Sequence, residues 1–314
     1  MFSKKVMSVL VVPGFIVVFA SFCLAGGIGT TGAQFLKIGI GARPVSMGYA
    51  FSAVSDDLNA LYWNPAGLAM QKERQISASY LHYFQEVSIG FFGYSQSIMN
   101  RGTVGIGLSY LSVGGFEKRA LDTDVPDGKF GANDGALYLS YADEKILGDK
   151  IEGLNLGFTI KGIRQEIDDQ DATSFALDVG TLYRTPIEKL NASLGVYNIG
   201  TKVKFVEESD PLPLDIRFGL SYKMLQEKLL LAADIDDYIN DERVYSQLGV
   251  EYAMVQSLSF RAGYKFGMDS NKLGGGAGLG TGVGFYVWGI QLDYAYAPFG
   301  ELGDTHRMSI ATKF

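Results

Sequence analysis

The chain has 314 residues, of which 47% are hydrophobic and 13% aromatic, with 40 glycines and only 8 prolines. Its formal net charge is −7, and its Lys and Arg residues are scattered, so it lacks the basic footprint of a nucleic-acid-binding protein. The low proline content excludes a disordered chain rich in Pro and Gly. Glycine at this level within strand-like sequence indicates close backbone approach, bends and small side chains facing a lumen.

Residues 1–25 have the pattern of a secretory signal peptide. A basic start at Lys4 and Lys5 precedes an apolar run of about 15 residues, and small residues permit cleavage after Ala25. A transmembrane anchor is less well supported, because a spanning helix needs roughly 20 apolar residues. A lipoprotein signal at Cys23 is the other alternative. Cleavage after Ala25 removes this single cysteine, so we expect no disulfide and no thiolate chemistry in the mature chain.

Residues 26–74 do not alternate between apolar and polar positions. We expect a short helix over residues 54–61, with Ser55 as its N-cap and with Asp56 and Asp57 in its first turn, where the helix dipole favours acids. The residue before a proline avoids the α region, so Asn64 should end this helix. Asn64 can also cap a second short turn that has Pro65 at its first position.

From residue 75 to the C-terminus, apolar and polar residues alternate with the period of a β-strand. In the clearest run, Trp288, Ile290 and Leu292 fall on one face, and Gly289 and Gln291 fall on the other. We expect about fourteen strands, at residues 75–84, 86–98, 102–114, 133–143, 151–165, 172–184, 190–199, 212–223, 228–238, 243–254, 257–267, 275–286, 288–298 and 305–314. Bacterial single-chain barrels have an even number of strands, and this count agrees with that rule.

Alternation alone also fits a soluble β-sandwich, but two features favour a transmembrane barrel. The runs are about 9 to 12 residues long, which is the length that a tilted strand needs to cross a bilayer. Charges within the runs, at Arg217, Lys223, Arg261 and Lys265, stay opposite the apolar row, where a wet lumen can hold them. A cation facing mid-bilayer lipid would cost roughly 2–4 kcal/mol. The predicted fold is therefore an all-β antiparallel barrel over residues 75–314.

The ends of the predicted strands suggest the orientation of the barrel. Residues 119–133 and 202–211 have the length of outer loops, whereas residues 100–102 and 226–227 have the length of tight periplasmic turns. The last run places Phe314, the terminal residue, on its apolar face. This pattern resembles the C-terminal signal that the barrel-assembly machinery reads, so we expect a bacterial outer-membrane protein that meets membrane lipid, lipopolysaccharide and that machinery.

Residues 26–74 are well placed to plug the lumen as an N-terminal hatch, although a position in the periplasm is the alternative. Several blocks in this part resemble the PorV/PorQ family of outer-membrane proteins: Phe35-Leu36-Lys37-Ile38, Gly41-Ala42-Arg43-Pro44, Met47-Gly48, Ser55-Asp56-Asp57 and Tyr62-Trp63-Asn64-Pro65-Ala66-Gly67-Leu68. That family is related to the FadL-like transporters of long-chain fatty acids and other hydrophobic compounds. The resemblance implies a fourteen-stranded barrel with a hatch whose motif comprises Asp56, Asp57, Trp63, Asn64, Pro65, Ala66 and Gly67.

The resemblance implies passive transport of a hydrophobic small molecule, or alternatively a PorV/PorQ-type role beside the proteins of type IX secretion at the cell surface. Enzymatic activity, a cofactor and a metal are not expected, because His82 and His306 lie far apart in the sequence and no mature cysteine remains. The glycine-rich run at residues 274–280 lacks the Lys-Ser/Thr ending of a phosphate loop. A bend or a lateral opening in the barrel wall is the better interpretation of that run.

Overall fold

The computed structural model describes residues 29–83, 87–98, 101–119, 122, 124–146, 151–268, 276–300 and 303–314. Most of these residues lie in long strands, which follow a short helical segment. Within these ranges, no helix combines the length and the apolar character needed to cross a membrane. The predicted signal peptide at residues 1–25 lies outside the described residues.

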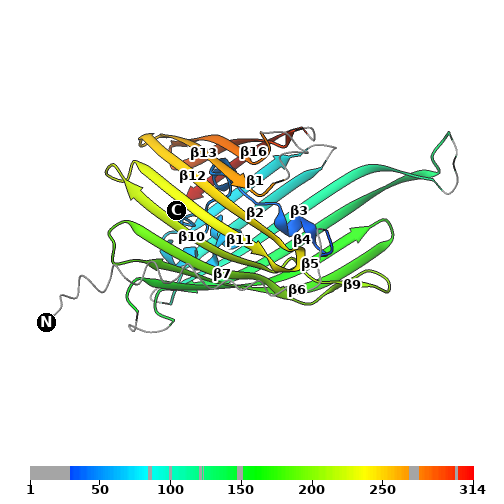
Figure 1. The fold of residues 1–314 in the computed structure, drawn as a ribbon, viewed down its shortest axis with the longest axis horizontal. Coiled ribbons are helices and arrows are strands. Elements are labelled where there is room, and N and C mark those ends of the chain that lie inside the picture. Colours follow the sequence, from blue (N-terminus) through cyan, green and yellow to red (C-terminus); the bar gives the residue numbers. More distant parts are fainter. Residues whose placement is uncertain are drawn as a thin grey trace.

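Fourteen antiparallel strands of the described chain close into a barrel (Figure 1). They are β1 (Gln75–His82), β2 (Ser88–Ser97), β3 (Thr103–Lys118), β4 (Gly128–Asp143), β5 (Leu154–Ile167), β6 (Gln170–Arg184), β7 (Leu190–Gly200), β10 (Asp215–Met224), β11 (Leu229–Tyr238), β12 (Arg243–Val255), β13 (Leu258–Phe266), β14 (Leu279–Val287), β15 (Ile290–Pro298) and β16 (Asp304–Lys313). The first and last strands pair, with Gln75 opposite Lys313. The predicted barrel and its strand number are confirmed.

The alternation in the sequence becomes an inner and an outer face of the wall. Large apolar side chains on the outer face are exposed, among them Leu248, Leu292 and Ile310. Arg217 and Arg261 point inward and are almost completely buried. Because every second residue faces the lumen, the charges stay out of the lipid and the apolar row meets it. The barrel therefore belongs to a bacterial outer membrane, as its sequence predicts.

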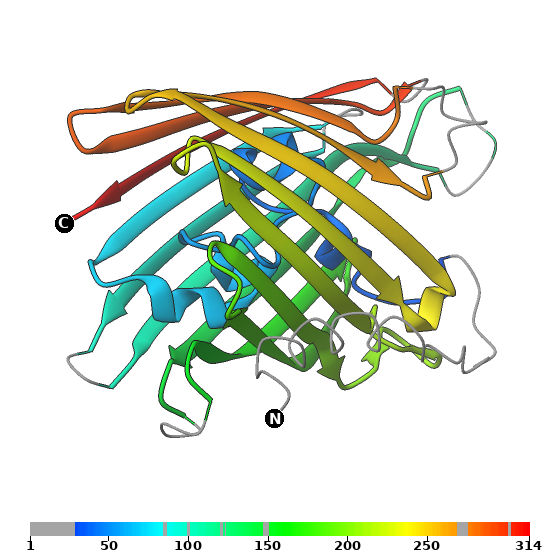
Figure 2. The same cartoon turned by 60° about the vertical axis from the view of Figure 1, so that its left-hand side comes forward.

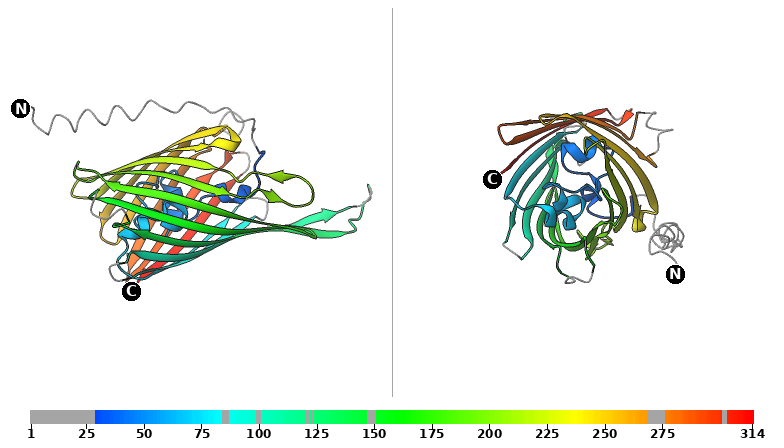
Figure 3. Two further views of the ribbon diagram at one scale, coloured as in Figure 1. Left: turned by 90° about the horizontal axis from the view of Figure 1, so that it is seen from below. Right: turned by 90° about the vertical axis from the view of Figure 1, so that its left-hand side faces the viewer.

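The two ends of the barrel differ in the length of their connections. The end that holds the C-terminus has tight connections, such as residues 256–257 and 288–289, and the opposite end has the long segment between β7 and β10. Bacterial barrels keep short turns in the periplasm and longer loops outside, so we assign the C-terminal end to the periplasm. The outer end also carries the protruding hairpin of β3 and β4 (Figure 3).

Several strand boundaries differ from the prediction by a few residues, and two of these differences have a clear physical cause. The expected outer loop at residues 119–133 is shorter, because β4 begins at Gly128 and extends the hairpin beyond the barrel wall. Strand β10 begins at Asp215 and not at residue 212, since Pro211 and Pro213 have no N–H to donate to a strand ladder. In this connection β8 (Val203–Lys204) pairs with β9 (Ser209–Asp210).

We refer to residues 29–74 as the N-terminal segment; it lies inside the ring of strands (Figures 2 and 3). It contains four short elements: η2 (Gln34–Lys37), α2 (Ala42–Ser46), α3 (Ala60–Trp63) and η3 (Pro65–Met70). The predicted turn after Pro65 is confirmed, with the side chain of Asn64 accepting a hydrogen bond from the N–H of Ala66. The predicted start of the helix at residue 54 is wrong, because Ser55 has φ 21° and donates its hydroxyl to the carbonyl of Phe51, so that α3 begins only at Ala60. The predicted end of this helix is confirmed, since Asn64 follows its last residue.

Glycines of the wall allow the backbone of the N-terminal segment to lie directly against the strands. A Cβ atom at Gly263 would overlap the backbone of Met47 and Gly48, and one at Gly157 would overlap Pro65 and Ala66. Gly48 itself has φ 61° and approaches the β13 backbone at the same contact. The high glycine content of the strands therefore has a clear physical use, which is to seat a plug without space for side chains between the two backbones.

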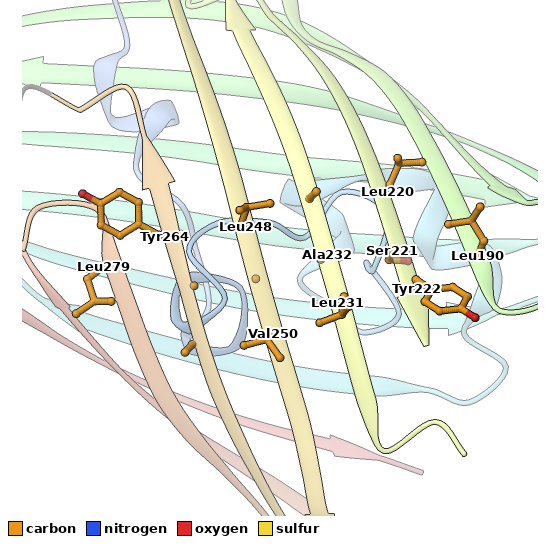
Figure 4. Close-up of a pocket in the computed structure, with 14 residues that line it drawn as sticks. Leu190, Leu220, Ser221, Tyr222, Leu231, Ala232, Leu248, Val250, Tyr264 and Leu279 are labelled. Carbon is orange, nitrogen blue, oxygen red and sulfur yellow. The ribbon is translucent and has the colours of Figure 1, made fainter. Parts of the chain in front are cut away.

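Outside this contact the wall carries a shallow apolar groove of about 690 Å³ (Figure 4). Leu220, Leu231, Leu248 and Tyr264 of four successive strands line it together with small residues such as Ala233. These side chains belong to the lipid-facing row. The neighbouring β14 pairs with β13 over residues 279–285 and with β15 over residues 281–287, so the wall is continuous there. The described residues 276–278 of the glycine-rich run form a turn at the end of β14, and no lateral opening lies along the paired part of this strand.

Candidate functional site

Asn64 and Trp63 join the N-terminal segment to the barrel wall. The Asn64 side-chain amide donates to the carbonyls of Ser52 and Thr181 at 2.9 and 3.0 Å, and thus ties a turn of the segment to β6. The indole of Trp63 donates to the carbonyl of Ile40 at 3.0 Å, and its ring is almost completely buried. Asn64 satisfies partners on both the segment and the wall, which explains why an amide suits this position.

Arg43 is the centre of an ion-pair cluster that bridges the segment and the wall. Its Nη1 lies 2.5 Å from Asp56 and 2.9 Å from Asp57, and its Nε lies 2.8 Å from Glu251 of β12. Burial alone would lower the pKa of Arg43, and the three carboxylates hold it above its ordinary value. Burial raises the pKa of Asp57 despite the opposing charge of Arg43. The guanidinium therefore stays charged and draws the two acids of the motif against β12.

A chain of charges continues from Glu251 around the wall. Arg261 of β13 lies 2.5 Å from Glu251 and 2.7 Å from Asp293 of β15. Charges on β12, β13 and β15 thus neutralise one another within the lumen. Low exposure of these side chains makes the pairs sensitive to loss of either partner.

A second cluster holds the segment at Trp63. Arg217 of β10 pairs with Asp215 at 2.7 Å and with Asp236 of β11 at 3.0 Å. Arg217 also donates to the carbonyl of Trp63 at 3.2 Å, and the hydroxyl of Tyr197 donates to the same carbonyl at 2.9 Å. The guanidinium lies 5.2 Å from the indole ring, within the range of a cation–π contact.

The backbone between the two clusters is also fixed to the wall. Asp234 of β11 accepts hydrogen bonds from the N–H groups of Phe51 and Ser52, at 3.0 and 2.7 Å. The hydroxyl of Ser52 lies 2.8 Å from that of Ser193 on β7. Strands β7 and β11 both neighbour β10 in the barrel, so their side chains fix this loop of the segment against one part of the wall.

On the extracellular side of the segment lies a cavity of about 160 Å³, which we call the outer cavity. Its lining consists of aromatic and cationic side chains together with two aliphatic ones: Lys37, Ile38, Tyr49, Tyr83, Tyr238, Tyr245, Lys265, Met268, Phe299 and Arg307. The first three residues come from the N-terminal segment, and the others come from the wall and its outer connections. A ligand in this cavity would contact both the N-terminal segment and the barrel wall.

The structure brings the predicted motif residues together at the interface between the segment and the wall. Asp56 and Asp57 meet Arg43, whereas Trp63 and Asn64 contact β6, β7 and β10. Pro65 and Ala66 lie against Gly157, and Gly67 packs on Ser55. Phe314 is distant from this site; it is 58% exposed on the outer face at the periplasmic end.

The sequence alone did not identify several residues of this site. Arg217, Arg261 and Lys265 were predicted to face the lumen, but their partners Glu251, Asp236 and others on neighbouring strands were not. The available signal was a charge at an inward position of an alternating strand. His82 and His306, which seemed unrelated, are cross-strand neighbours on the exposed outer face. Among the described residues, no group of three or more His, Cys, Asp or Glu side chains is arranged to hold a metal ion.

Several solved structures have a similar barrel fold, and two of them are toluene transporters. The toluene transporter TbuX of Ralstonia pickettii has a TM-score of 0.60 and 14% identity, with 88% of this chain and 98% of that chain covered. The toluene transporter TodX of Pseudomonas putida has a TM-score of 0.62 and 12% identity, with 88% and 99% covered. A FadL homologue of Pseudomonas aeruginosa has a TM-score of 0.58 and 10% identity, with 92% and 99% covered. At these identities the likeness establishes the fold alone.

Comparison of the sequence with models of protein families identifies the family of this chain. No curated protein sequence matches the chain. A family model described as type IX secretion system protein PorV matches residues 26–240, which is more than half of the chain and includes the N-terminal segment and the barrel strands from β1 to β11. The barrel, the plug contacts and this match agree with the resemblance seen in the sequence, and the chain belongs to the PorV family.

Proposed function

We propose that this protein is a passive outer-membrane transporter of small hydrophobic molecules and not an enzyme. The observation that carries the proposal is the outer cavity, an aromatic-lined space that the plug and the wall build together on the extracellular side. Ligand pockets are commonly such concave, mostly apolar spaces with a few polar groups. The transporters with the same fold support the proposal, because their barrels also serve hydrophobic compounds.

In this proposal, residues 1–25 are a cleaved signal peptide, residues 26–74 are a hatch, and residues 75–314 are the barrel. A ligand leaves the aqueous phase, enters the outer cavity and contacts Lys37, Ile38 and Tyr49 of the hatch. The hatch occupies the lumen and is tied to the wall on several sides, so passage requires it to move. Movement has to break the contacts of Arg43 and Asn64 with the wall.

Deleting residues 33–70 tests the proposal. The wild-type chain and the deletion variant are expressed at equal level in the outer membrane of a host that lacks its own hydrophobic-compound transporter, and uptake of radiolabelled toluene and oleate is followed. The deletion should change the rate of uptake, because it removes both the hatch and one side of the outer cavity. Equal uptake of every hydrophobic compound tested would refute the transport proposal.

A second candidate function is a binding or scaffold role in type IX protein secretion, which the family match supports. The feature that fits it is the β3–β4 hairpin, which extends beyond the barrel on the extracellular side (Figure 1). Its distal part exposes Phe116, and Val125 at its tip is also exposed. A protruding hairpin with exposed apolar side chains can meet a partner at the cell surface.

Affinity purification in mild detergent distinguishes the second candidate from the first. The tagged protein should recover secretion-system proteins from a bacterium that has type IX secretion, and a variant with a shortened β3–β4 hairpin should not. Repeated recovery of the barrel alone would contradict the secretion role. It would leave the transport proposal intact, because transport depends on the hatch and not on the hairpin.

A further inference from the structure

The outer cavity contains an excess of positive charge. Three cations line it, namely Lys37, Lys265 and Arg307, and no carboxylate does so among the residues that the structure describes there. Lys37 has an acidic partner, since its Nζ lies 2.9 Å from Asp241. The charges of Lys265 and Arg307 lack such a partner in the described chain, so the cavity is electrostatically suited to an anion.

Arg307 is the strongest sign of an unfilled site. Its side chain is 3% exposed, and its Nη1 donates to the carbonyl of Gly39 on the N-terminal segment. Its Nε and Nη2 are fully buried, and neither has a hydrogen-bond partner in the described residues. A buried guanidinium with two unused donors is costly, and a carboxylate or similar oxyanion can satisfy both donors in a bidentate arrangement.

Lys265 provides a second positive charge, which no carboxylate of the described residues pairs with. Its Nζ lies 5.0 Å from the ring centre of Tyr49 and 4.1 Å from that of Tyr245, and this ammonium has no hydrogen bond or ion pair with the residues that the structure describes. Two acids of nearby strands, Asp215 and Asp236, pair with Arg217 instead. Aromatic faces hold an ammonium in place but leave its charge available to an anion.

The size and the lining of the cavity limit the rest of the ligand. A volume of about 160 Å³ is close to that of a cavity that holds one benzene molecule, and it is well below the range of about 300–1,000 Å³ for drug-sized ligands. Five aromatic rings surround it, from Tyr49, Tyr83, Tyr238, Tyr245 and Phe299. Aromatic rings pack favourably edge-to-face or offset against another ring, so a single-ring ligand fits this lining.

We propose that the outer cavity is a binding site for a small aromatic carboxylate, with the carboxylate against Arg307 and Lys265 and the ring among the tyrosines. This inference rests on the proposed transport function and specifies the class of substrate. It differs from transport of neutral hydrocarbons in one respect: the charge of the ligand contributes to binding. The carboxylate also links the wall to the hatch, because Arg307 already holds the carbonyl of Gly39.

Binding of benzoate and of benzyl alcohol to the purified, detergent-solubilised full-length protein tests the inference by isothermal titration calorimetry. The two ligands share a ring and differ in charge. The wild type should bind benzoate at least about tenfold more tightly than benzyl alcohol, as expected for charge-assisted hydrogen bonds. Arg307→Gln should abolish most of this preference, and Lys265→Met should reduce it.

The control is Arg164→Gln, which removes the same charge at a position where the side chain is 67% exposed and pairs only at 3.8–3.9 Å. It should leave the preference for benzoate unchanged. Equal affinity of the wild type for the two ligands, or unchanged preference in both cavity variants, would overturn the inference. If Arg307→Gln does not assemble, Lys265→Met still decides the outcome.

Uptake measurements separate this inference from the proposed function. Preferential binding of benzoate without any uptake would overturn transport but keep the aromatic-acid site. Uptake of hydrophobic compounds without preferential binding of benzoate would do the reverse. Loss of both would show that the outer cavity serves neither task.

Discussion

Arg43 contacts three carboxylates, more than any other described cation between the N-terminal segment and the wall. It pairs with Asp56 and Asp57 on the hatch and with Glu251 on β12. Buried ion pairs often contribute little net stability, but removal of one partner leaves the others uncompensated. Without Arg43, two hatch carboxylates would face a wall carboxylate with only Arg261 nearby.

Arg43→Met should therefore lower the free energy of unfolding by about 3–5 kcal/mol. The measurement is equilibrium urea unfolding of the protein in detergent micelles, followed by tryptophan fluorescence. Arg164→Met removes a charge from exposed, loosely paired surface and should change the free energy by less than about 1 kcal/mol. Similar losses in both variants would contradict the importance of the Arg43 cluster.

Gly263 of β13 lets the backbone of the N-terminal segment lie directly against the wall. An added methyl group at this position would overlap the backbone of Met47 and Gly48, which cannot shift as easily as a flexible side chain. Gly263→Ala should cost about 1–3 kcal/mol by overpacking and should expose the N-terminal segment to limited proteolysis. Gly90→Ala is the matched control, because nothing lies within 4 Å of a Cβ at Gly90. Equal resistance of both variants to protease would contradict the importance of the backbone contact at Gly263.

At the residue scale, the sequence predicts some of the site and cannot predict the rest. Asn64 and Pro65 were recognisable because a proline restricts the residue before it and an Asn side chain can cap the following turn. The pairing of Arg43 with Glu251 joins residues more than 200 positions apart in the chain. Only the closed barrel brings them together. The alternation of residues along a single strand does not reveal how the strands and the N-terminal segment are placed relative to one another.

The β3–β4 hairpin is the element that departs most from a minimal barrel. Both strands have 16 residues, and after the register shift near Val113 they continue together beyond the wall. The distal part carries a contact between Phe116 and Phe130 with ring centres 5.3 Å apart. These features add nothing to the closure of the barrel.

Replacing residues 114–131 with Asn-Gly should leave the barrel intact. Val113 and Ala132 are direct cross-strand neighbours, and Asn-Gly favours the two-residue turn that such a pair requires. The altered protein should retain the heat-modifiable gel mobility of a folded barrel, and it should lose secretion partners if the hairpin binds them. Loss of heat-modifiability would show that the hairpin is needed for assembly.

At the element scale, the strands were predictable and their ends were less so. Period-two alternation located all fourteen barrel strands, because one face meets lipid and the other meets the lumen. The early start of β4 was missed since Gly128–Asn133 lacks strong alternation, and hairpin pairing above the membrane needs no apolar face. The helix expected over residues 54–61 starts only at Ala60, because the chain just before it is held in a non-helical loop: Asp234 accepts hydrogen bonds from the N–H groups of Phe51 and Ser52.

The whole molecule is a barrel whose lumen is occupied by its own N-terminal segment. Contacts from β6, β7, β10, β11, β12 and β13, together with those from β2, β3 and β16 on the rest of the wall, surround the segment. The glycines of the wall remove the space between the segment and the strands. Such a barrel should not behave as an open porin. The lumen has to be emptied or rearranged before anything passes through it.

Planar-bilayer recording tests this closed state. The wild-type protein should show no large, steady ion conductance, whereas the variant without residues 33–70 should form stable open channels, since a polar lumen then spans the membrane. The variant must retain heat-modifiable mobility, which confirms that its barrel is closed. Large steady conductance from the wild type would contradict a sealed lumen.

The most direct test of hatch movement uses a reversible bond between hatch and wall. The hydroxyls of Ser52 and Ser193 lie 2.8 Å apart, so Ser52→Cys with Ser193→Cys places two sulfurs where a disulfide can form. Uptake of hydrophobic compounds should fall to background in the oxidised double variant and return after reduction, while each single variant transports normally under both conditions. Undiminished uptake through the fully oxidised protein would contradict the requirement that the hatch moves.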